Sequence, residues 1–497
     1  MLLIVRQIGV DVVVEVRDPR GRLVDVVDSP TGRSGEERVE VMAEPRGDFA
    51  IRVRPFAANE PAGRYRLSIA EWRDARATAQ LLAQRTRVRD SAAAWLRARA
   101  APLRLEQLEE VGSLASAVEG ARVVGLGEAT HGSRELGDLR LAVTQHLVRR
   151  HGFRMIAVEY SATRMGMLNQ WALGSPAGDA MRPVLELGWI GRRTIPELTE
   201  WVRRWNVDHP GDRVTLVGVD AHDHAEAGSR VRDVVARAFG PPMVARFDTA
   251  AAELARADSQ ASVFGNSSVG SATHRTLVEI VARLDADAPL LARSLGDTTV
   301  QAARDAARNL MQFADFNAGS SDSRSRDWYM AVNLLRALDR EPAGARAVYW
   351  AHNAHVAVAP SRSPRFRTTG GLLRASLGCA YRAWGTSFGS GGFVAQRLGD
   401  RSNRLEISTL PPPPAETIDA VMGQLLGGPA FATWDCATNP EQAPGWLRAP
   451  QVMHWVGGVF DPAGPRSSAF QPFELLRDFD GMFYLPTVTA EEMPDDR

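Results

Sequence analysis

Hydrophobic and polar residues alternate along the first 72 residues of the chain in short runs that are separated by turn residues. The runs are rich in β-branched residues and are punctuated by Pro, Gly and Asp, as in DPRG and EPRGD. Short alternating strands between such turns are typical of an antiparallel sandwich. We therefore expect residues 1–72 to form a small all-β accessory domain, with the strands VDVVVEV, RLVDVV, RVEVMA, FAIRVRPF and RYRLSIAEW.

The pattern changes after this region. Residues 73–100 contain no Gly or Pro and are dense in Ala, Leu and Arg, so we expect a helix that leads into a second domain. The apolar run 121–126, the amphipathic segment 133–151 and the apolar run 154–159 then predict one βαβ unit. The parallel strands of such a unit end on the same edge of the sheet.

Two further apolar runs, 213–219 and 346–350, continue this pattern, and each follows helical sequence. Residues 225–345 between them are mostly helical in pattern and are interrupted by the loop GNSSVGSAT. We therefore expect residues 73–497 to form an α/β domain, in which helices flank a parallel-sheet core and residues 225–345 are a helical insertion. The apolar run GMFYLP near the C-terminus is expected to add a strand to the same domain.

Polar side chains suited to acid–base chemistry follow each of the four expected parallel strands. They are Glu128 and His131 after the first strand, Glu159 at the end of the second, Asp220, His222, Asp223 and His224 after the third, and His352, Asn353 and His355 after the fourth. Five of the ten histidines thus fall just past a strand, which random scatter would not readily produce. Because ligands bind outside the carboxyl ends of parallel strands, we expect a site at this edge.

Taken one at a time, these residues have ordinary structural explanations. A Glu-x-x-His turn more often makes local hydrogen bonds, and a glutamate at a strand end more often pairs with an arginine. Their convergence favours a functional site, in which histidine would suit a general acid or base near pH 7. Gly127 and Gly132 are expected to let the GEATHG loop turn tightly over the sheet edge.

Metal catalysis is one alternative, because four histidines and three carboxylates gather at this edge. The histidines are His222, His224, His352 and His355, and the carboxylates are Glu128, Glu159 and Asp220. However, the chain has no HExxH motif, and an HxH pair beside a carboxylate is a weak signal.

Serine catalysis is a second alternative, because GTSFG at 385–389 matches the GxSxG pattern around Ser387. A nucleophile elbow requires a strand, a sharp turn and then a helix, whereas GSGGFVAQRL favours a turn into another strand. Only His454 lies downstream to complete the order Ser, acid, His. We therefore interpret GTSFG as a chance match in a Gly/Ser-rich turn.

Composition narrows the possible chemistry. All 59 basic residues are arginine, which excludes a Schiff-base lysine, a Walker lysine and a Ser-Lys dyad. The formal net charge of +0 provides no general attraction for nucleic acid or an anionic membrane, and no apolar run approaches the ~20 residues that span a bilayer. Cys379 and Cys436 have no spacing typical of a zinc site or a disulfide framework, so we expect packed thiols.

The opening MLLIVRQIGV lacks the apolar core and cleavage site of a secretory signal, so a cytoplasmic location is expected. Met1 nevertheless falls inside what looks like an early strand. A strand or a signal peptide missing upstream of Met1 would weaken this expectation, and secretion is the alternative if the true start lies upstream.

The segment VVGLGEATHGSRELGDLR, followed by GFRMIAVE, resembles the opening block of the erythromycin esterase family. Later blocks agree with the family in order and rough spacing: WIGRRTIPELTEWVRRWN, RVTLVGVD, SRDWYMAVNLL and VYWAHNAHVA. The resemblance covers about residues 80–490. The N-terminal region is instead similar in pattern to the pre-peptidase C-terminal-like β-sandwich, a non-catalytic module that is compatible with docking to a protein partner.

The family resemblance implies an α/β hydrolase that opens a macrolactone ester without a metal and without a covalent serine intermediate. His131 matches the general base that removes a proton from the attacking water, and Glu128 is close enough to orient it. His352 matches a second catalytic histidine that donates to the oxyanion or the leaving alkoxide. Glu159 and His355 match neighbouring site positions.

Arg140 matches a basic position near the site, where its guanidinium would supply a fixed positive charge. Asp220 and Trp189 are expected among the substrate-binding residues, and no cofactor is expected. Many family members carry an aromatic pair where this chain has Leu136 and Gly137, which removes bulk from a candidate pocket wall.

Substrate and class therefore stay open at this level. The leading hypothesis is a metal-independent hydrolase of a small-molecule ester or lactone. The alternatives are a tailoring enzyme that acts on a peptide or polyketide product, and a haem- or metal-binding protein of the same superfamily.

Overall fold

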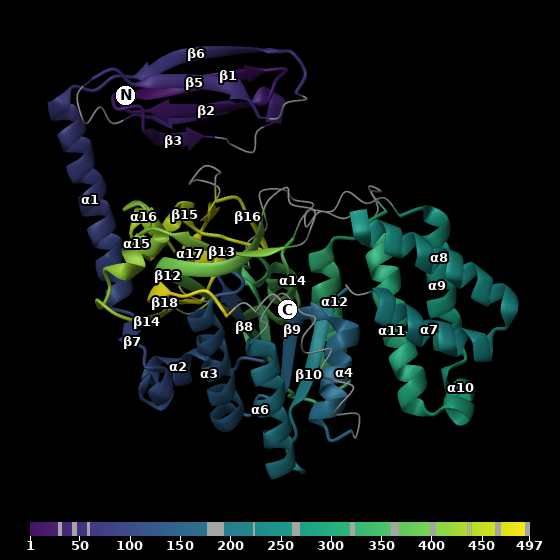
Figure 1. Ribbon diagram of the computed structural model, residues 1–497. Helices are drawn as coiled ribbons and strands as arrows, with labels where there is room; N and C mark the ends of the chain where they lie inside the picture. The colour runs from purple at the N-terminus through teal and green to yellow at the C-terminus, as the bar shows by residue number, and fades with distance from the viewer. Residues whose placement is uncertain are drawn as a thin grey trace. The chain divides into compact units, whose positions relative to one another are not determined.

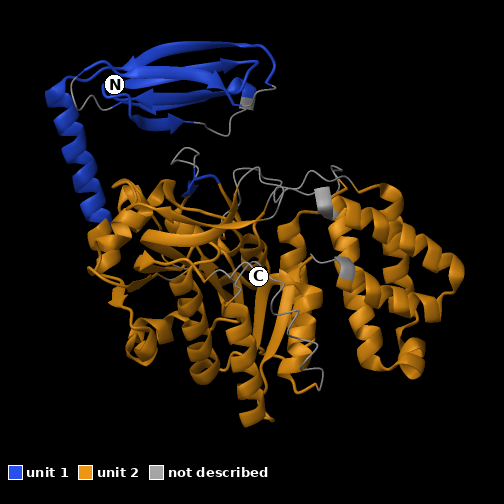
Figure 2. Cartoon of the chain, viewed as in Figure 1, with its two compact units in different colours: residues 1–92, 461–472 blue, residues 93–460, 473–497 orange. Residues whose placement is uncertain are grey.

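A computed structural model provides the fold of the chain (Figure 1). It describes residues 1–27, 32–41, 47–56, 60–175, 193–221, 224–260, 269–318, 324–358, 367–397, 404–434, 436, 438, 440–462 and 469–492. Two compact units make up the chain, residues 1–92 with 461–472, and residues 93–460 with 473–497 (Figure 2).

The N-terminal unit contains two three-stranded antiparallel sheets. Their strands are β1 (Leu2–Ile8), β2 (Val12–Arg17), β3 (Leu23–Val27), β4 (Glu36–Glu40), β5 (Ala50–Pro55) and β6 (Arg64–Glu71), in the orders β4-β1-β6 and β3-β2-β5. The alternating valines and leucines of β1, β2 and β4 pack into one shared core. The expected antiparallel strands of residues 1–72 are therefore confirmed, whereas the domain boundary at residue 72 and the similarity to the pre-peptidase module stay predictions.

The helix expected over 73–100 runs as α1 (Ala75–Arg97), and Ala100–Pro102 forms the short strand β7. Beyond it lies a ten-stranded sheet, whose central order is β10-β9-β11-β8-β12-β18-β14-β7. Its strands include β8 (Val123–Glu128), β9 (Met155–Ser161), β10 (Thr215–Asp220), β11 (Ala347–His352), β12 (Tyr381–Arg397), β14 (Ala430–Thr433) and β18 (Gly481–Val488). Two more strands, β13 (Leu405–Leu410) and β16 (Val459–Phe460), pair with β12.

The four strands predicted from the apolar runs are β8, β9, β10 and β11, and they lie side by side and parallel. All six residues of β8 and all six of β11 are buried. Strands covered on both faces must be apolar throughout, which explains why these runs show no alternation. In the β8–β11 register His352 lies opposite Glu128, so the parallel strands bring their carboxyl ends to one edge.

Helices pack along this sheet. The longer ones are α3 (Arg134–His151), α4 (Ala162–Ala172), α6 (Thr194–Asp208) and α14 (Thr369–Leu377). Shorter helical elements of the chain are η2 (Leu105–Glu110), α2 (Gly112–Ala117), α13 (Asn353–Val356), η4 (Gly378–Ala380), α15 (Ile418–Gly423), η5 (Pro440–Gln442), α16 (Gly445–Arg448) and α17 (Leu475–Asp478). The short strands β15 (Gln451–His454) and β17 (Phe470–Phe473) are not part of the ten-stranded sheet. Among the helices that the structure describes, none is both long and apolar enough to cross a bilayer.

The described residues of the region 225–345 are mostly helical, as predicted, whereas the first half of the expected loop GNSSVGSAT lies outside the described residues. It contains α7 (His224–Ala238), α8 (Pro241–Gln260), α9 (Ser271–Ala286), α10 (Ala288–Leu295), α11 (Asp297–Phe316) and α12 (Arg326–Asp339). Buried residues of α7, α8, α9 and α11 form a core distinct from that of the N-terminal unit.

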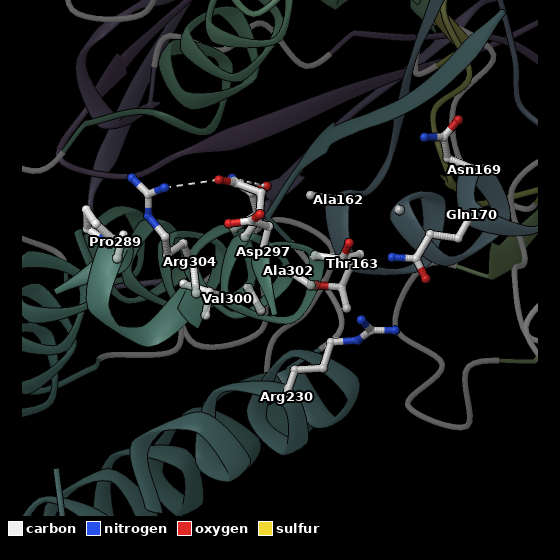
Figure 3. Close-up of a pocket in the computed structure, with 17 residues that line it drawn as sticks. Ala162, Thr163, Asn169, Gln170, Arg230, Pro289, Asp297, Val300, Ala302 and Arg304 are labelled. Atoms are coloured by element: carbon white, nitrogen blue, oxygen red, sulfur yellow. Dashed lines mark hydrogen bonds between the residues drawn. The ribbon is translucent and has the colours of Figure 1, made fainter. Parts of the chain in front are cut away.

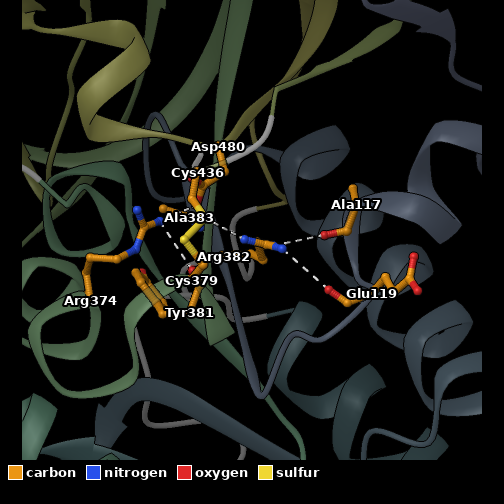
Figure 4. Close-up of a disulfide and its surroundings, with 9 residues drawn as sticks. All are labelled: Ala117, Glu119, Arg374, Cys379, Tyr381, Arg382, Ala383, Cys436 and Asp480. Atoms are coloured by element: carbon orange, nitrogen blue, oxygen red, sulfur yellow. Dashed lines mark hydrogen bonds and ion pairs between the residues drawn. A yellow bond between two sulfur atoms is a disulfide. The ribbon is translucent and has the colours of Figure 1, made fainter. Parts of the chain in front are cut away.

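The two cysteines form a disulfide, which corrects the expectation of packed thiols (Figure 4). Cys379 precedes β12 and Cys436 follows β14, at a sequence separation of 57. Closing a loop of this length removes about 4 kcal/mol of chain entropy from the unfolded state. The spacing carried no signal because the two segments meet only in the folded sheet. Structural disulfides persist mainly in oxidising compartments.

Candidate active site

The loop after β8 places a histidine against a carboxylate. Strand β8 ends at Glu128, the backbone N–H of Ala129 donates to Thr386 Oγ1 at 2.9 Å, and the chain then turns through Gly132 into α3. His131 Nδ1 lies 2.7 Å from Glu128 Oε1, and both side chains are buried. The tight loop therefore builds a carboxylate–imidazole pair within four residues.

The two glycines of this loop have different reasons. Gly132 has φ 67°, which favours glycine, and a Cβ there would lie 2.7 Å from Val394 Cβ. Gly127 lies within β8 rather than in the turn, and a Cβ there would collide with the side-chain oxygen of Asn353. The expected turning role is thus confirmed for Gly132, whereas Gly127 permits the close approach of Asn353.

Glu128 is held in its ionised form. Its Oε2 pairs with Arg140 Nη2 at 2.6 Å, and Arg140 Cζ lies 4.9 Å from the centre of the Trp350 ring. Burial by itself raises the pKa of Glu128, but the charge of Arg140 and the hydrogen bond from His131 outweigh it and lower that pKa. An ionised Glu128 is a hydrogen-bond acceptor for His131 Nδ1–H, and in the neutral ring this arrangement puts the lone pair on Nε2.

His352 lies beside this pair, with Nδ1 as a hydrogen-bond acceptor and Nε2 as the nitrogen that carries the proton. Its ring centre is 5.4 Å from that of His131, and its Nδ1 accepts the backbone N–H of Ala354 at 3.2 Å. Burial lowers the pKa of His352 to about 3, so the ring is neutral, and because Nδ1 is an acceptor its proton lies on Nε2. That Nε2 is buried and has no hydrogen-bond partner among the described residues.

Glu159, at the end of β9, supports His352 from behind. Its Oε2 accepts the backbone N–H of His352 at 2.8 Å, and its Oε1 accepts Arg326 Nη2 at 2.7 Å. Burial raises the pKa of Glu159, yet the cationic His355 and Arg326 hold it well below its usual range. Arg326 also donates from Nε to both oxygens of Asp220, at 3.0 and 3.1 Å.

His355 completes this network as a cation. Its Nδ1 lies 2.8 Å from Asp327 Oδ1 and its Nε2 lies 3.3 Å from Glu159 Oε1. Burial lowers the pKa of His355, but the two carboxylates overcome that effect and raise it to about 10. Arg326 Nη1 is 3.2 Å from His355 Nε2, which is a contact of two cations held together by Glu159 rather than a hydrogen bond.

This network predicts a pH-dependent stability. The pKa of His355 is raised from 6.5 to about 10 in the folded state, so its stabilising effect is complete below 6.5 and is lost as the pH rises through 10. We expect urea unfolding to show a falling free energy of unfolding between these values, and a smaller fall in His355→Gln. Equal falls in both proteins would show that other groups cause the effect.

The structure thus brings together Glu128, His131, Arg140, Glu159, Asp220, His352 and His355 at one sheet edge. Trp189, His222 and Asp223 lie outside the described residues, as does the side chain of His224. Asp220 is committed to Arg326, so its expected role in substrate binding stays a prediction.

Sequence reasoning missed Arg326, Asp327 and Trp455. The first two lie at the start of α12, within the quoted SRDWYM block, and only the fold shows that α12 begins beside β9 and β11. Trp455 comes from a distant loop, and its ring centre is 5.8 Å from that of His352. No pattern near Trp455 signals this contact.

The space beside Gly137 is filled, which corrects the expected loss of bulk from a pocket wall. A Cβ at Gly137 would collide with Thr194 Oγ1 of α6. Thr194 Oγ1 in turn donates to Glu491 Oε1 at 3.1 Å, and Leu136 is fully buried. Gly137 therefore permits helix packing and opens no space for a ligand.

Ser387 lies within β12 rather than in the expected Gly/Ser-rich turn, so no nucleophile elbow forms. It is fully buried and donates to Asp419 Oδ1 at 2.6 Å. His454 Nδ1 lies 3.1 Å from the carbonyl oxygen of Phe388, and the His454 backbone N–H donates to Asp419 Oδ2 at 2.8 Å. The serine thus donates to the acid, and the group is enclosed in the core.

The three described imidazoles of the edge, those of His131, His352 and His355, are each held by neighbouring groups. Both nitrogens of His355 face carboxylates, and one nitrogen each of His131 and His352 is committed to Glu128 and to the backbone. Within the described ranges no group of three or more His, Cys, Asp or Glu side chains has the geometry to hold a metal.

Two cavities differ in their relation to this site. A cavity of about 700 Å³ lies between α4 and the insertion helices α7, α10 and α11, and Thr163, Arg230 and Asp297 are among its lining residues (Figure 3). A cavity of about 10 Å³ touches Glu128, Arg140 and Glu159. Of these two cavities, only the small one borders the polar edge. The candidate active site is therefore identified by its side chains and not by the size of a cavity.

Comparison with known proteins places the chain in context. Residues 148–488 match the family model described as erythromycin esterase. Erythromycin esterase type I from Escherichia coli is 25% identical over 270 residues, which cover 50% of this chain and 64% of that protein. The match therefore spans less than two thirds of that relative.

Solved structures share the fold. A Bacillus cereus protein superposes with a TM-score of 0.63 at 19% identity, covering 81% of this chain and 98% of its own. A succinoglycan biosynthesis protein gives 0.60 at 18% identity, covering 82% and 99%. A mutant of the erythromycin esterase EreC in its open conformation gives 0.58 at 19% identity, covering 80% and 99%. At these identities the likeness concerns the α/β fold alone.

Proposed function

Because the chain belongs to the erythromycin esterase family, we propose that it hydrolyses carboxylic esters with His131 as the general base that activates water. Residues 73–497 would carry this activity, with residues 1–72 as an accessory domain. The relative from Escherichia coli, whose name is erythromycin esterase, makes macrolactones the first substrates to examine.

The observation that carries this proposal is the geometry of two neighbouring histidines, one with its Nδ1 against a carboxylate and the other with its Nδ1 on a backbone N–H. In the proposal, His131 Nδ1–H donates to Glu128 Oε1, so the lone pair of the neutral ring lies on Nε2. His352 presents a proton on a buried Nε2 that has no partner among the described residues. A base and a hydrogen-bond donor are the two groups that addition of water to an ester carbonyl needs.

The chemical steps then follow from these roles. His131 removes a proton from water as the oxygen attacks the carbonyl carbon, and Glu128 stabilises the resulting imidazolium. His352 Nε2–H donates to the oxyanion that develops on the carbonyl oxygen. When the carbon–oxygen bond to the leaving group breaks, the His131 imidazolium returns its proton to the alkoxide, which leaves an acid and an alcohol.

The remaining charged residues support this pair in the proposal. Arg140 fixes Glu128, and Glu159 holds the backbone of His352 through a 2.8 Å hydrogen bond. Arg326 and His355 keep Glu159 ionised. Asp327 fixes His355 in turn.

The proposal is tested by a panel of macrolides and aryl esters with the wild-type protein, the Ser387→Ala variant and a chelator. We expect turnover that is unchanged by the chelator and by Ser387→Ala, because neither a metal nor that serine takes part. Loss of turnover on chelation would support metal catalysis instead. If no ester is cleaved, the substrate class is wrong.

Two other functions use the same edge differently. A tailoring enzyme would act on an ester or carboxyl group of a peptide or polyketide, and the panel should then include such compounds. A haem- or metal-binding protein would show a Soret band or a bound metal after purification.

For the location, we propose an oxidising compartment, which alkylation and mass spectrometry of the Cys379–Cys436 pair in native cells would test.

A further inference from the structure

The N-terminal unit carries an unusual share of exposed apolar side chains. Ten of the sixteen exposed large hydrophobic residues among those described lie within residues 1–92. Three of them, Tyr65, Leu67 and Ile69, alternate along β6 and are 50%, 48% and 61% exposed. Contiguous apolar surface of this kind marks an interaction site more often than it marks an ordinary surface.

These three side chains lie on the core side of their sheet. In the antiparallel β1–β6 register, Leu67 is opposite Val5 and Ile69 is opposite Leu3, and both partners on β1 are buried. Residues directly opposite each other in an antiparallel pair point to the same face. The apolar face of the sheet thus continues onto β6, where it is left uncovered.

Strand β6 is also an edge strand, because among the described strands it pairs with β1 alone. The three other edges of the two sheets carry protective features. Strand β4 has the inward-pointing Glu37, β5 ends in Pro55, and β3 is five residues long and contains Asp25. On β6 the inward stripe from Tyr65 to Ile69 has no charge and no proline.

The sequence of β6 is self-complementary. When two copies pair antiparallel about Leu67, Tyr65 of each copy lies opposite Ile69 of the other, and Leu67 lies opposite Leu67. On the other face the long Arg66 lies opposite the small Ser68, and Arg64 lies opposite Ala70. No like charges are opposed in this register.

Neighbouring registers fit less well. A two-fold axis perpendicular to the sheet preserves the faces only if the register shifts by two residues at a time. One shift places Arg66 opposite Arg66, which is destabilising. The other shift places Tyr65 opposite Glu71 and retains only the Leu67–Ile69 pairs.

We propose that the protein forms a dimer through antiparallel pairing of β6 with β6 of a second copy, centred on Leu67. The occupant of this edge is another copy of the chain, joined by an isologous interface in which a six-stranded sheet is formed. The pairing satisfies the free backbone groups of the edge and joins the two apolar stripes.

The test is sedimentation velocity of the full chain over a range of concentrations. We expect a monomer–dimer equilibrium, and about tenfold weaker association in Leu67→Glu, because two carboxylates then oppose each other at the axis. Ala70→Glu is the matched control. It adds the same charge three residues away but opposite Arg64, so we expect association that is unchanged or tighter.

All the altered side chains are exposed, and circular dichroism would establish that each variant is folded. Oxidation of Leu67→Cys provides a second readout, since the two native cysteines are already paired. A covalent dimer from Leu67→Cys, and none from Ala70→Cys, would support the register. A monomer at every concentration, or a dimer that tolerates Leu67→Glu, would overturn the proposal.

Discussion

Replacing His131 with alanine is expected to reduce kcat for ester hydrolysis by about 10²–10⁴-fold, the range typical of a general base. The variant removes the only imidazole whose Nδ1 lies against Glu128, at 2.7 Å, within the described residues. In the proposed mechanism, the attacking water would then lack the base that acts beside the His352 donor. The loss should fall on kcat more than on KM, because proton transfer occurs in the transition state.

The measurement is steady-state hydrolysis of whichever ester the wild-type protein turns over. His209→Ala is a suitable control, since His209 is exposed and stacks on Trp205, away from the sheet edge. The control should keep wild-type kcat, and circular dichroism should show that both variants are folded. Retained turnover in His131→Ala would rule out the proposed base.

Replacing Arg326 with methionine is expected to reduce both stability and activity. Glu159 and Asp220 are 6% and 2% exposed, and the variant leaves their two carboxylates without their shared cation. Breaking a buried ion pair costs about 3–5 kcal/mol. The Arg326 side chain is itself 31% exposed, so we expect the lower end, about 3 kcal/mol.

Chemical denaturation of the wild type and a double-mutant cycle with Asp220→Asn would measure this effect. Removing the Asp220 charge as well should recover part of the lost stability, because only one of the two carboxylates that Arg326 binds is then still charged without it. Arg340→Met is the control for the loss of an arginine, since its ion pair with Asp305 is exposed. A variant Arg326→Met as stable as Arg340→Met would contradict the buried network.

The sequence was sufficient for the parallel strands and for most of the edge residues. The runs that became β8, β9, β10 and β11 are mainly apolar, and such runs are strongly constrained by burial on both faces. Because parallel strands end on one edge, the positions of Glu128, Glu159 and His352 followed from the strand ends. The positions of these residues depend only on the local sequence pattern and on the geometry of a parallel sheet.

The sequence misled where a local pattern had more than one meaning. GTSFG has the letters of a nucleophile motif and the glycines of a turn, yet it lies inside β12, a strand of 17 residues. Glycine there permits the close packing of β18 and of Phe479 against the sheet. A glycine that makes room for a neighbouring element and a glycine that permits a turn cannot be distinguished from the sequence alone.

By itself, then, the sequence determined the two kinds of structure in the chain, the parallel edge and the acid–base residues along it. Only the tertiary structure decided the contacts between segments far apart, namely Arg326 between Glu159 and Asp220, and the Cys379–Cys436 disulfide. It also decided the protonation states, because the pKa values of His352 and His355 move in opposite directions. Burial and neighbouring charges act across space, so two histidines three positions apart acquire different roles.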